Sequence, residues 1–240
     1  MNIKILGTGT SIPSLKRLSS SYLVTIGDYR ILIDAGPSVV RRLLEFGYTV
    51  EDIDLIIITH FHVDHTADLS TFLFACNYGI KPRQKPLTII GGPGFRRFFK
   101  GLSKIYPWIM PNYYDLYIKV MSMHPFELND ITITARSVNH NRESIAVRID
   151  AGKSVVFSGD TSYSKRLIEL AKGVDLMITE CSFPERKVKG HLNLANLARI
   201  IEGARPKRVI LSHLYPDWDD FKGVLHEPYL LAEDGMEIGL

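Results

Sequence analysis

This sequence of 240 residues has few cysteines, no long apolar run and only a small net charge. Each of these features argues against a class of protein. The two cysteines, Cys76 and Cys181, lie far apart and form no C-x-x-C pair, so we expect neither a disulfide framework nor a thiolate zinc site. Aliphatic runs such as residues 55–58 fall far short of the ~20 apolar residues that a membrane span needs. A net charge of +3, with basic residues spread along the chain, does not demand nucleic acid.

The remaining composition is that of an ordinary globular protein, with 45% hydrophobic and 23% charged residues. The segment MNIKILGTGT enters a strand pattern directly, without the features of a signal peptide. We therefore expect a cytoplasmic protein with no membrane attachment. Because no low-complexity linker or internal repeat interrupts the pattern, we expect a single domain over residues 1–240.

Short runs rich in Ile and Val alternate with helical patterns, which is typical of an α/β protein. Strands are predicted at 2–7, 21–27, 29–34, 53–59, 114–121, 131–138, 144–150, 153–159, 174–181, 207–212 and 236–240. Helices are predicted from Pro37 to Gly47, at 66–79, after 91–94, at 162–172 and at 191–203. Hairpins mixed with helix-linked strands predict two sheets packed face to face, with helices outside and functional loops at one edge.

The segment THFHVDH, residues 59–65, concentrates three histidines and an aspartate after an apolar strand. Strand alternation places His60 and His62 on one side. The next turn can bring Asp64 and His65 back beside them. Imidazoles and carboxylates suit zinc, manganese or iron, and two such pairs in one short loop indicate two neighbouring metal ions.

A two-metal site needs about seven or eight ligand positions, so further ligands are expected elsewhere in the chain. Three candidates follow apolar strands: His140 in SVNHN, Asp160 in VVFSGDTS and His213 in VILSHLYP. Each residue alone is typical of a satisfied polar side chain, but three together at loop entries favour a shared metal centre. An aspartate suits the bridging position because each of its two oxygens can hold one metal.

The order H-x-H-x-D-H, then a histidine, then G-D-T, then S-H resembles the metallo-β-lactamase superfamily. The likeness extends from LGTGTSIPS near the start, through LIDAGP and DLMITECSF, to DGMEIGL. Within the superfamily the sequence is similar to the phosphodiesterase branch, which includes the tRNA 3′-processing endonuclease RNase Z and smaller cyclic or diester phosphodiesterases. The resemblance implies an αββα four-layer sandwich with a dinuclear metal site at one edge.

The cofactors that this resemblance implies are two divalent metal ions, zinc in the first place, with manganese or iron as alternatives. Asp160 stands where several β-lactamases of the superfamily use cysteine, and His62 stands where its flavodiiron proteins use glutamate. Together these two departures imply a hydrolytic site and not a redox site. The implied ligands form two sets with a bridging carboxylate between them: His60, His62 and His140 for one ion, Asp64, His65 and His213 for the other, and Asp160 as the bridge.

Two further residues resemble the phosphodiesterase branch specifically. Glu180 in TECSF and His191 in KGHLNLAN are similar to its H-E-A-T and H-S-T signatures, although Thr179 replaces the first histidine and Leu192 and Asn193 replace Ser-Thr. A histidine oriented by a carboxylate could donate a proton to the leaving alkoxide or stabilise negative charge. The alternative interpretation is a helix-start histidine and a surface glutamate at a strand end.

The expected reaction is hydrolysis of a small or medium phosphodiester by a hydroxide bridging the metals, with Asp64 orienting or deprotonating the water. RNase Z activity on nucleic acid is the main alternative. Against it, the tRNA endonucleases carry a long arm between these motifs, whereas only 19 residues separate His140 from Asp160. Hydrolysis of a β-lactam or thioester, and a non-enzymatic metal-bound sensor, are further alternatives. Members of the superfamily often form homodimers, which is a further expectation.

The aromatic stretch at 106–117 has two interpretations. Its rings either wall a substrate pocket by base stacking or pack between a sheet and an outer helix. His124 and His226 have no partner pattern and are expected to be structural or solvent-facing.

Overall fold

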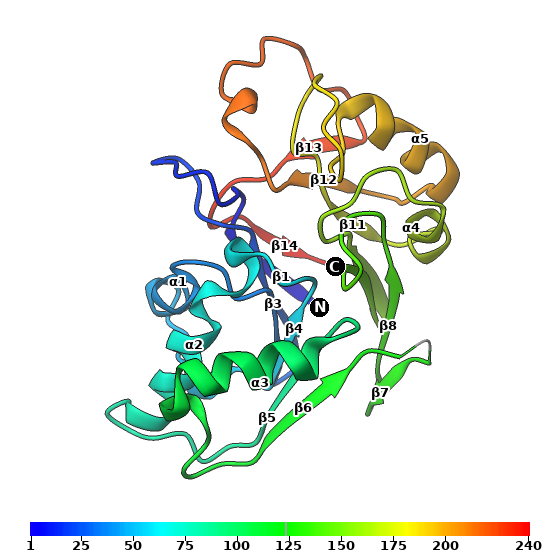
Figure 1. The fold of residues 1–240 in the computed structure, drawn as a ribbon. Helices are drawn as coiled ribbons and strands as arrows, with labels where there is room; N and C mark the ends of the chain where they lie inside the picture. Colours follow the sequence, from blue (N-terminus) through cyan, green and yellow to red (C-terminus); the bar gives the residue numbers. More distant parts are fainter. Residues whose placement is uncertain (123) are drawn as a thin grey trace.

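Two seven-stranded sheets pack face to face in the computed structural model, which describes residues 1–122 and 124–240 (Figure 1). The first sheet has the order β14-β1-β2-β3-β4-β5-β6, with β14 Glu237–Gly239, β1 Asn2–Gly7, β2 Ser21–Ile26, β3 Tyr29–Ile33, β4 Leu55–Ile58, β5 Leu87–Gly91 and β6 Leu116–Val120. The second has the order β13-β12-β11-β10-β9-β8-β7, with β13 Tyr229–Leu231, β12 Val209–Ser212, β11 Leu176–Glu180, β10 Lys153–Phe157, β9 Ile145–Ala151, β8 Ile131–Ser137 and β7 Phe126–Leu128.

Helices cover the outer face of each sheet, as Figure 1 shows. The first sheet is covered by α1 (Val39–Glu45), α2 (Val63–Tyr78) and α3 (Phe95–Ile105), and the second by α4 (Lys165–Leu170) and α5 (Leu194–Ala204). Short 3₁₀ turns η1 (Val50–Asp52), η2 (Pro107–Ile109) and η3 (Pro216–Trp218) lie in the connections. The αββα four-layer sandwich expected from the sequence is therefore confirmed.

Strand β4 shows how the sequence builds these layers. Alternation of its side chains sends Leu55 and Ile57 into the core between the sheets, while Ile56 and Ile58 pack against the helices. A strand with apolar residues on both faces is therefore buried on both faces, and all four side chains are fully buried.

The direction of the strands gathers their ends at one edge of the sandwich. In the first sheet β3, β4, β5 and β6 pair in parallel, and in the second β10, β11, β12 and β13 do so. The carboxyl ends of neighbouring parallel strands lie side by side, so polar residues that follow them meet in space. The two chain ends also lie close together, because β1 pairs with β14 through Ile3 and Ile238 (Figure 1).

Some element boundaries differ from the predictions. Helix α2 begins at Val63, so Asp64 and His65 lie in its first turn and not in a loop. An acidic residue is favourable there because it faces the positive end of the helix dipole. Helix α1 begins at Val39, so Pro37 precedes the helix and does not open it. Strands β5, β7 and β13 were not predicted; β7 and β13 have three residues each, too short for a clear alternation.

Arg83 fixes the connections around β4 and β5 from a fully buried position. Its guanidinium donates to four backbone carbonyls, those of Val50, Ile53, Lys85 and Pro86. We expect Arg83→Met to lower the free energy of unfolding by about 3 kcal/mol or more, because each carbonyl left without a donor costs about 1–3 kcal/mol. Thermal unfolding followed by circular dichroism measures this loss.

The matched control for Arg83 is Arg41→Met on α1, whose side chain is exposed and pairs with Glu45. Because an exposed ion pair contributes about 0–1 kcal/mol, this variant should unfold close to the wild-type midpoint. Equal midpoints for the two variants would contradict a structural role for Arg83.

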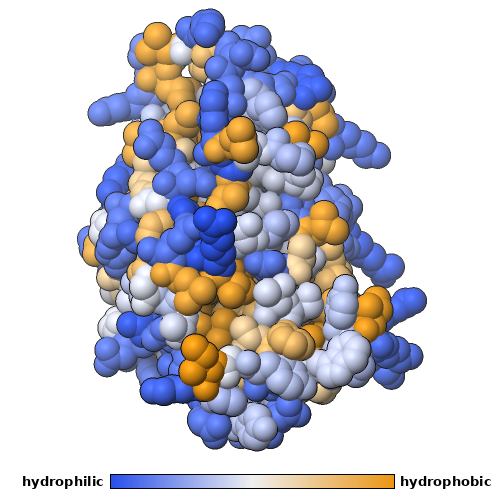
Figure 2. Space-filling model, turned by 90° about the vertical axis from the view of Figure 1, so that its left-hand side faces the viewer, coloured by the Kyte–Doolittle hydropathy of each residue, from blue (hydrophilic) through white to orange (hydrophobic). Residues whose placement is uncertain are grey.

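The face shown in Figure 2 carries apolar patches set among hydrophilic ones. Side chains that reach the surface include those of Leu44, Phe74 and Tyr78. Among the described residues, no helix combines the length and the apolar character that crossing a membrane requires.

Candidate metal centre

The structure brings together all nine side chains that the sequence singled out, at the edge where the parallel strands end. They come from the ends of five strands and the segments that follow them: His60, His62, Asp64 and His65 after β4, His140 after β8, Asp160 after β10, Glu180 at the end of β11 with His191 in the segment after it, and His213 after β12. Residues up to 153 positions apart therefore meet here, as their place at strand ends predicts.

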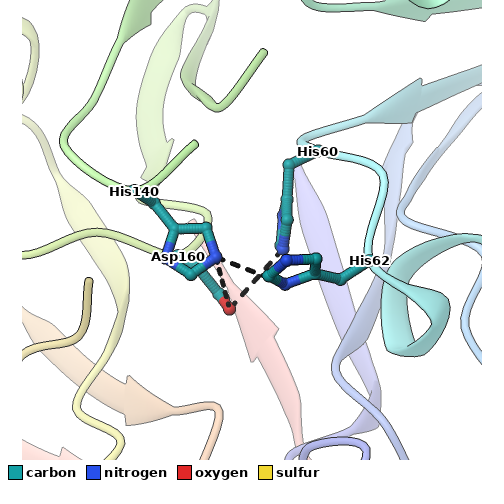
Figure 3. A group of neighbouring side chains, drawn as sticks. All are labelled: His60, His62, His140 and Asp160. Atoms are coloured by element: carbon teal, nitrogen blue, oxygen red, sulfur yellow. Dashed lines mark hydrogen bonds and ion pairs between the residues drawn. The ribbon is translucent and has the colours of Figure 1, made fainter. Parts of the chain in front are cut away.

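The first group holds His60, His62, His140 and Asp160 (Figure 3). One ligand atom from each lies within 4.8 Å of the others. The Oδ2 atom of Asp160 is 3.6 Å from His60 Nε2 and 3.9 Å from His140 Nε2. His62 approaches the same space with its Nδ1 atom, which is 3.3 Å from His140 Nε2. The three rings and the carboxylate therefore point at one common volume.

The second group holds Asp64, His65 and His213, again with ligand atoms within 4.8 Å of one another. Asp160 adjoins this group as well, because its Oδ1 is 3.5 Å from His65 Nε2 and its Oδ2 is 3.3 Å from His213 Nε2. The carboxylate of Asp160 thus stands between the two groups.

Three buried polar atoms at the centre have no hydrogen-bond partner among the residues that the structure describes: Nε2 of His60, Nε2 of His65 and Oδ2 of Asp160. A buried polar atom left unpaired costs free energy, so native proteins rarely leave three together without a reason. All three are atoms with which histidine and aspartate bind metal ions. The residues present therefore fit a metal centre.

The electrostatics favour the metal-binding form at four of the candidate ligands. Burial holds the pKa of His60 well below its usual range and lowers the pKa of His140, which favours neutral rings. Burial alone would raise the pKa of Asp64 and Asp160, but neighbouring histidines, His213 foremost, outweigh it and lower both. Neutral imidazoles and ionised carboxylates are the forms that bind zinc. At His65, burial alone would lower the pKa, but neighbouring carboxylates, Asp160 foremost, outweigh it and raise that pKa to about 10.

Asp34, which was not predicted to belong to the site, holds His65 and also Thr59, the residue before His60. Its Oδ2 atom lies 2.7 Å from His65 Nδ1, and its carboxylate also accepts hydrogen bonds from the backbone N–H and hydroxyl of Thr59. The residue adopts φ of 63°, which aspartate tolerates better than most residues. With Nδ1 held by Asp34, His65 presents Nε2 to the metal space, an arrangement common behind metal-binding histidines.

Glu180 and His191 form a hydrogen-bonded pair next to Asp160. Glu180 is 3% exposed, so the interpretation of this residue as a surface strand end is wrong. Its Oε1 lies 3.2 Å from His191 Nδ1 and accepts from the backbone N–H of Thr161, while its Oε2 accepts from the backbone N–H of Leu192. Burial alone would lower the pKa of His191, but the hydrogen bond and charge of Glu180 outweigh it and raise that pKa.

His191 precedes α5, whose N-cap is Asn193, so it is not a helix-start residue. Its Nδ1 is also 3.9 Å from Asp160 Oδ2, and Asp160, His191 and His213 form a third group whose ligand atoms lie within 4.8 Å of one another. The geometry therefore allows His191 two roles, proton transfer or metal binding.

Ser182 is a second residue that sequence reasoning missed. Its hydroxyl donates to Glu180 Oε2 at 2.6 Å and lies 3.1 Å from His191 Nδ1 and 3.0 Å from His213 Nδ1. One hydroxyl thus connects a candidate metal ligand with the glutamate–histidine pair. The only signal in the sequence is its place two residues after Glu180, in TECSF.

The aromatic stretch at 106–117 lies apart from the centre. Trp108 is 58% exposed, and its backbone carbonyl accepts a hydrogen bond from Asn77 near the end of α2. A tyrosine near His191 comes from elsewhere in the chain: the ring of Tyr215 lies edge-on to that of His191, with centroids 5.9 Å apart, and its centroid is 4.5 Å from that of Phe183.

Both the sequence and the fold of this chain are similar to those of known proteins. Residues 1–235 match the family model described as anti-Pycsar protein Apyc1. The probable metallo-hydrolase YhfI of Bacillus subtilis is 30% identical over 224 residues, covering 89% of this chain and 87% of the relative. The crystal structure of YhfI, which is described as a metallo-β-lactamase fold protein, superposes on this structure with a TM-score of 0.81. The sequence identity is 26%, and the superposition covers 99% of this chain and 98% of YhfI.

Ribonuclease Z proteins are also similar. That of Brevibacillus brevis is 26% identical over 293 residues, covering 97% of this chain and 91% of the relative. The short form of human tRNase Z superposes with a TM-score of 0.83 at 21% identity over 100% and 99% of the two chains, a likeness of fold.

Proposed function

The chain belongs to the Apyc1 family and is a metal-dependent hydrolase of the metallo-β-lactamase fold, in its RNase Z-like branch, and we propose that it cleaves a phosphodiester bond. One observation carries this proposal: the buried carboxylate of Glu180 holds His191 beside Asp160, at the centre of the metal groups. Cleaving a phosphodiester releases an alkoxide, and a histidine oriented in this way can supply the proton that the alkoxide needs.

The metal ligands that we propose are those at the two groups, with zinc as the first candidate and manganese or iron as alternatives. One ion is assigned to His60, His62 and His140, the other to Asp64, His65 and His213, with Asp160 between them. Two divalent ions held there would lower the pKa of a water molecule between them and neutralise charge on the phosphoryl oxygens.

The chain's own residues supply the rest of the proposed reaction. Asp64 is held by the backbone N–H of Ser11 and lies 3.4 Å from His213, so its carboxylate is placed to orient the attacking water or accept its proton. His191, whose Nδ1 lies 3.9 Å from Asp160 Oδ2, donates a proton to the leaving oxygen or stabilises its negative charge. Glu180 fixes the ring of His191 through Nδ1.

The proposed substrate is a small or medium phosphodiester. In tRNA endonucleases of this kind a long arm lies between the histidine and G-D-T motifs, whereas here residues 141–159 hold the hairpin of β9 and β10. A tRNA precursor therefore stays the second candidate. We further propose that residues 1–240 act as one hydrolase domain in the cytoplasm, which two free buried cysteines fit, and a homodimer stays a prediction.

Purified protein with measured metal content tests the proposal. The substrates are bis(p-nitrophenyl) phosphate, thymidine 5′-monophosphate p-nitrophenyl ester, cyclic nucleotides and a tRNA precursor, with nitrocefin and a thioester as representatives of the other hydrolase classes. Turnover of diesters with zinc or manganese supports the proposal. Hydrolysis of only nitrocefin or the thioester, or no diester turnover with either metal, contradicts it.

Replacing Asp34 tests the support beneath the centre. We expect Asp34→Ala to weaken metal binding by about 10- to 100-fold, because His65 loses the partner that fixes its ring. Metal content after dialysis against a graded chelator series measures the change. The control is Asp54→Ala: Asp54 is also buried but accepts from Arg30 N–H and pairs with Lys85 away from the centre. Equal metal loss in both variants would argue against a specific role.

A further inference from the structure

A groove runs along α3, next to the segment after β4 and the loop that follows His140. Its volume is about 530 Å³, and its lining includes Phe61, Arg97, Phe98, Leu102, Ile105 and Glu143; we call it the α3 groove. Positions 94, 97, 98, 101, 102 and 105 of its lining recur at the spacing of one helix face. A helix of this length extends for roughly 16 Å, so the groove is long enough for a group larger than the reacting phosphate.

The groove is lined in part by residues from the two segments that carry proposed metal ligands. Phe61 stands between His60 and His62 in the chain, and Glu143 follows His140 by three residues. Consecutive Cα atoms are about 3.8 Å apart, so the ring of Phe61 leaves the backbone beside two ligand positions. Gly92 allows the segment before α3 to approach the loop that contains Glu143, because a Cβ at position 92 would lie 1.9 Å from the carbonyl oxygen of Glu143. The start of α3 and the His140 loop are thus in contact.

The end of the groove at Phe61 offers an aromatic surface. The rings of Phe61 and Phe98 are stacked, with centroids 4.7 Å apart and an interplanar angle of 20°. Both side chains are only partly buried, although Phe95 and Phe99 on the same helix are buried in the core. A pair of stacked rings open to a cavity suits a planar group, since stacking a base on an aromatic side chain is favourable.

Positive charge lines the same helix. Arg96, Arg97, Lys100 and Lys104 lie on α3, which has no acidic residue. Across the part of the chain that the structure describes, none of the four forms an ion pair. Of these cations only Arg97 lines the groove, one residue from Phe98. Its guanidinium is therefore free to donate to oxygen atoms of a ligand.

Building on the proposed function, we propose that the α3 groove is the specificity subsite for the non-leaving side of the phosphodiester, taking a planar ring on Phe61 and Phe98 while Arg97 donates to oxygen atoms of that group. The hydrolysis itself needs no such ring. The groove therefore selects among diesters that the metal centre treats alike.

Two esters with the same leaving group distinguish an effect on the proposed subsite from an effect on bond cleavage. Thymidine 5′-monophosphate p-nitrophenyl ester carries a ring on the non-leaving side, whereas methyl p-nitrophenyl phosphate carries only a methyl group. We expect Phe98→Leu and Arg97→Ala each to lower kcat/KM for the thymidine ester by about tenfold, mainly through KM, and to leave the methyl ester within about twofold. Leucine keeps the apolar packing of position 98 but removes the ring. The matched control Arg96→Ala removes the adjacent cation, which does not line the groove, and should change neither ester.

A binding measurement separates this proposal from the proposed function. Titration calorimetry of the metal-loaded protein with thymidine 5′-monophosphate needs no turnover, and we expect about tenfold weaker binding in Phe98→Leu and Arg97→Ala than in wild type or Arg96→Ala. If wild type cleaves no diester, the proposed function fails, and the same titration still decides the groove. Unchanged binding in both variants, or equal loss of kcat/KM on both esters, overturns the subsite. Thermal unfolding verifies that each variant is folded.

Discussion

Asp160→Ala is expected to reduce diester hydrolysis by about a thousandfold or more and to lower the content of bound metal at both groups. Among the residues that the structure describes, Asp160 is the one carboxylate that lies within 4 Å of histidines from both groups, so its loss removes a proposed ligand from each ion at once. A thousandfold loss corresponds to about 4 kcal/mol of transition-state stabilisation, which is within the range of metal-ion catalysis. Steady-state kinetics and elemental analysis of the same preparation measure both effects.

The control for Asp160 is Asp150→Asn. Asp150 lies on β9 and pairs with Arg148, outside the metal groups. This variant should retain activity and metal. If Asp160→Ala keeps both metals and more than a tenth of the activity, the bridging assignment is wrong.

Much of the site could be predicted because its residues follow buried strands. A run such as LIII or VILS is apolar on both faces and ends abruptly, so His60 and His213 mark the edge where parallel strands terminate. The two strands lie in different sheets, so their ends come together only because the sheets pack face to face. In the αββα sandwich the ends of these strands lie at one edge, so the fold itself brings the candidate ligands together.

What could not be predicted depends on contacts between side chains that no local pattern records. Asp34 and Ser182 are small polar residues next to strands, and many such residues only cap a turn. Their roles follow from the approach of His65 to one and of His191 and His213 to the other. The start of α2 was missed for a related reason: His and Asp are weak helix formers inside a helix, but its first turn tolerates them.

His191→Ala is expected to slow cleavage of a diester with an alkoxide leaving group by about 10²- to 10⁴-fold while both metals stay bound. The Nδ1 atom of His191 lies near Glu180, and an imidazole held through one nitrogen can use the other for proton transfer. Glu180→Gln keeps the size of the side chain but removes its charge, so it should give a smaller loss of the same kind.

Dependence on the leaving group distinguishes a proton donor from a metal ligand. Because p-nitrophenolate leaves as a stable anion, its release needs little help from a proton. Thymidylyl-thymidine releases an alkoxide and does need it. His191→Ala should therefore affect thymidylyl-thymidine much more than the p-nitrophenyl ester of thymidine 5′-monophosphate. His226→Ala, in which an exposed histidine is removed, should affect neither. Equal losses on both substrates, together with loss of metal, would place His191 in the third group with Asp160 and His213 as a ligand, and proton donation would then require another residue.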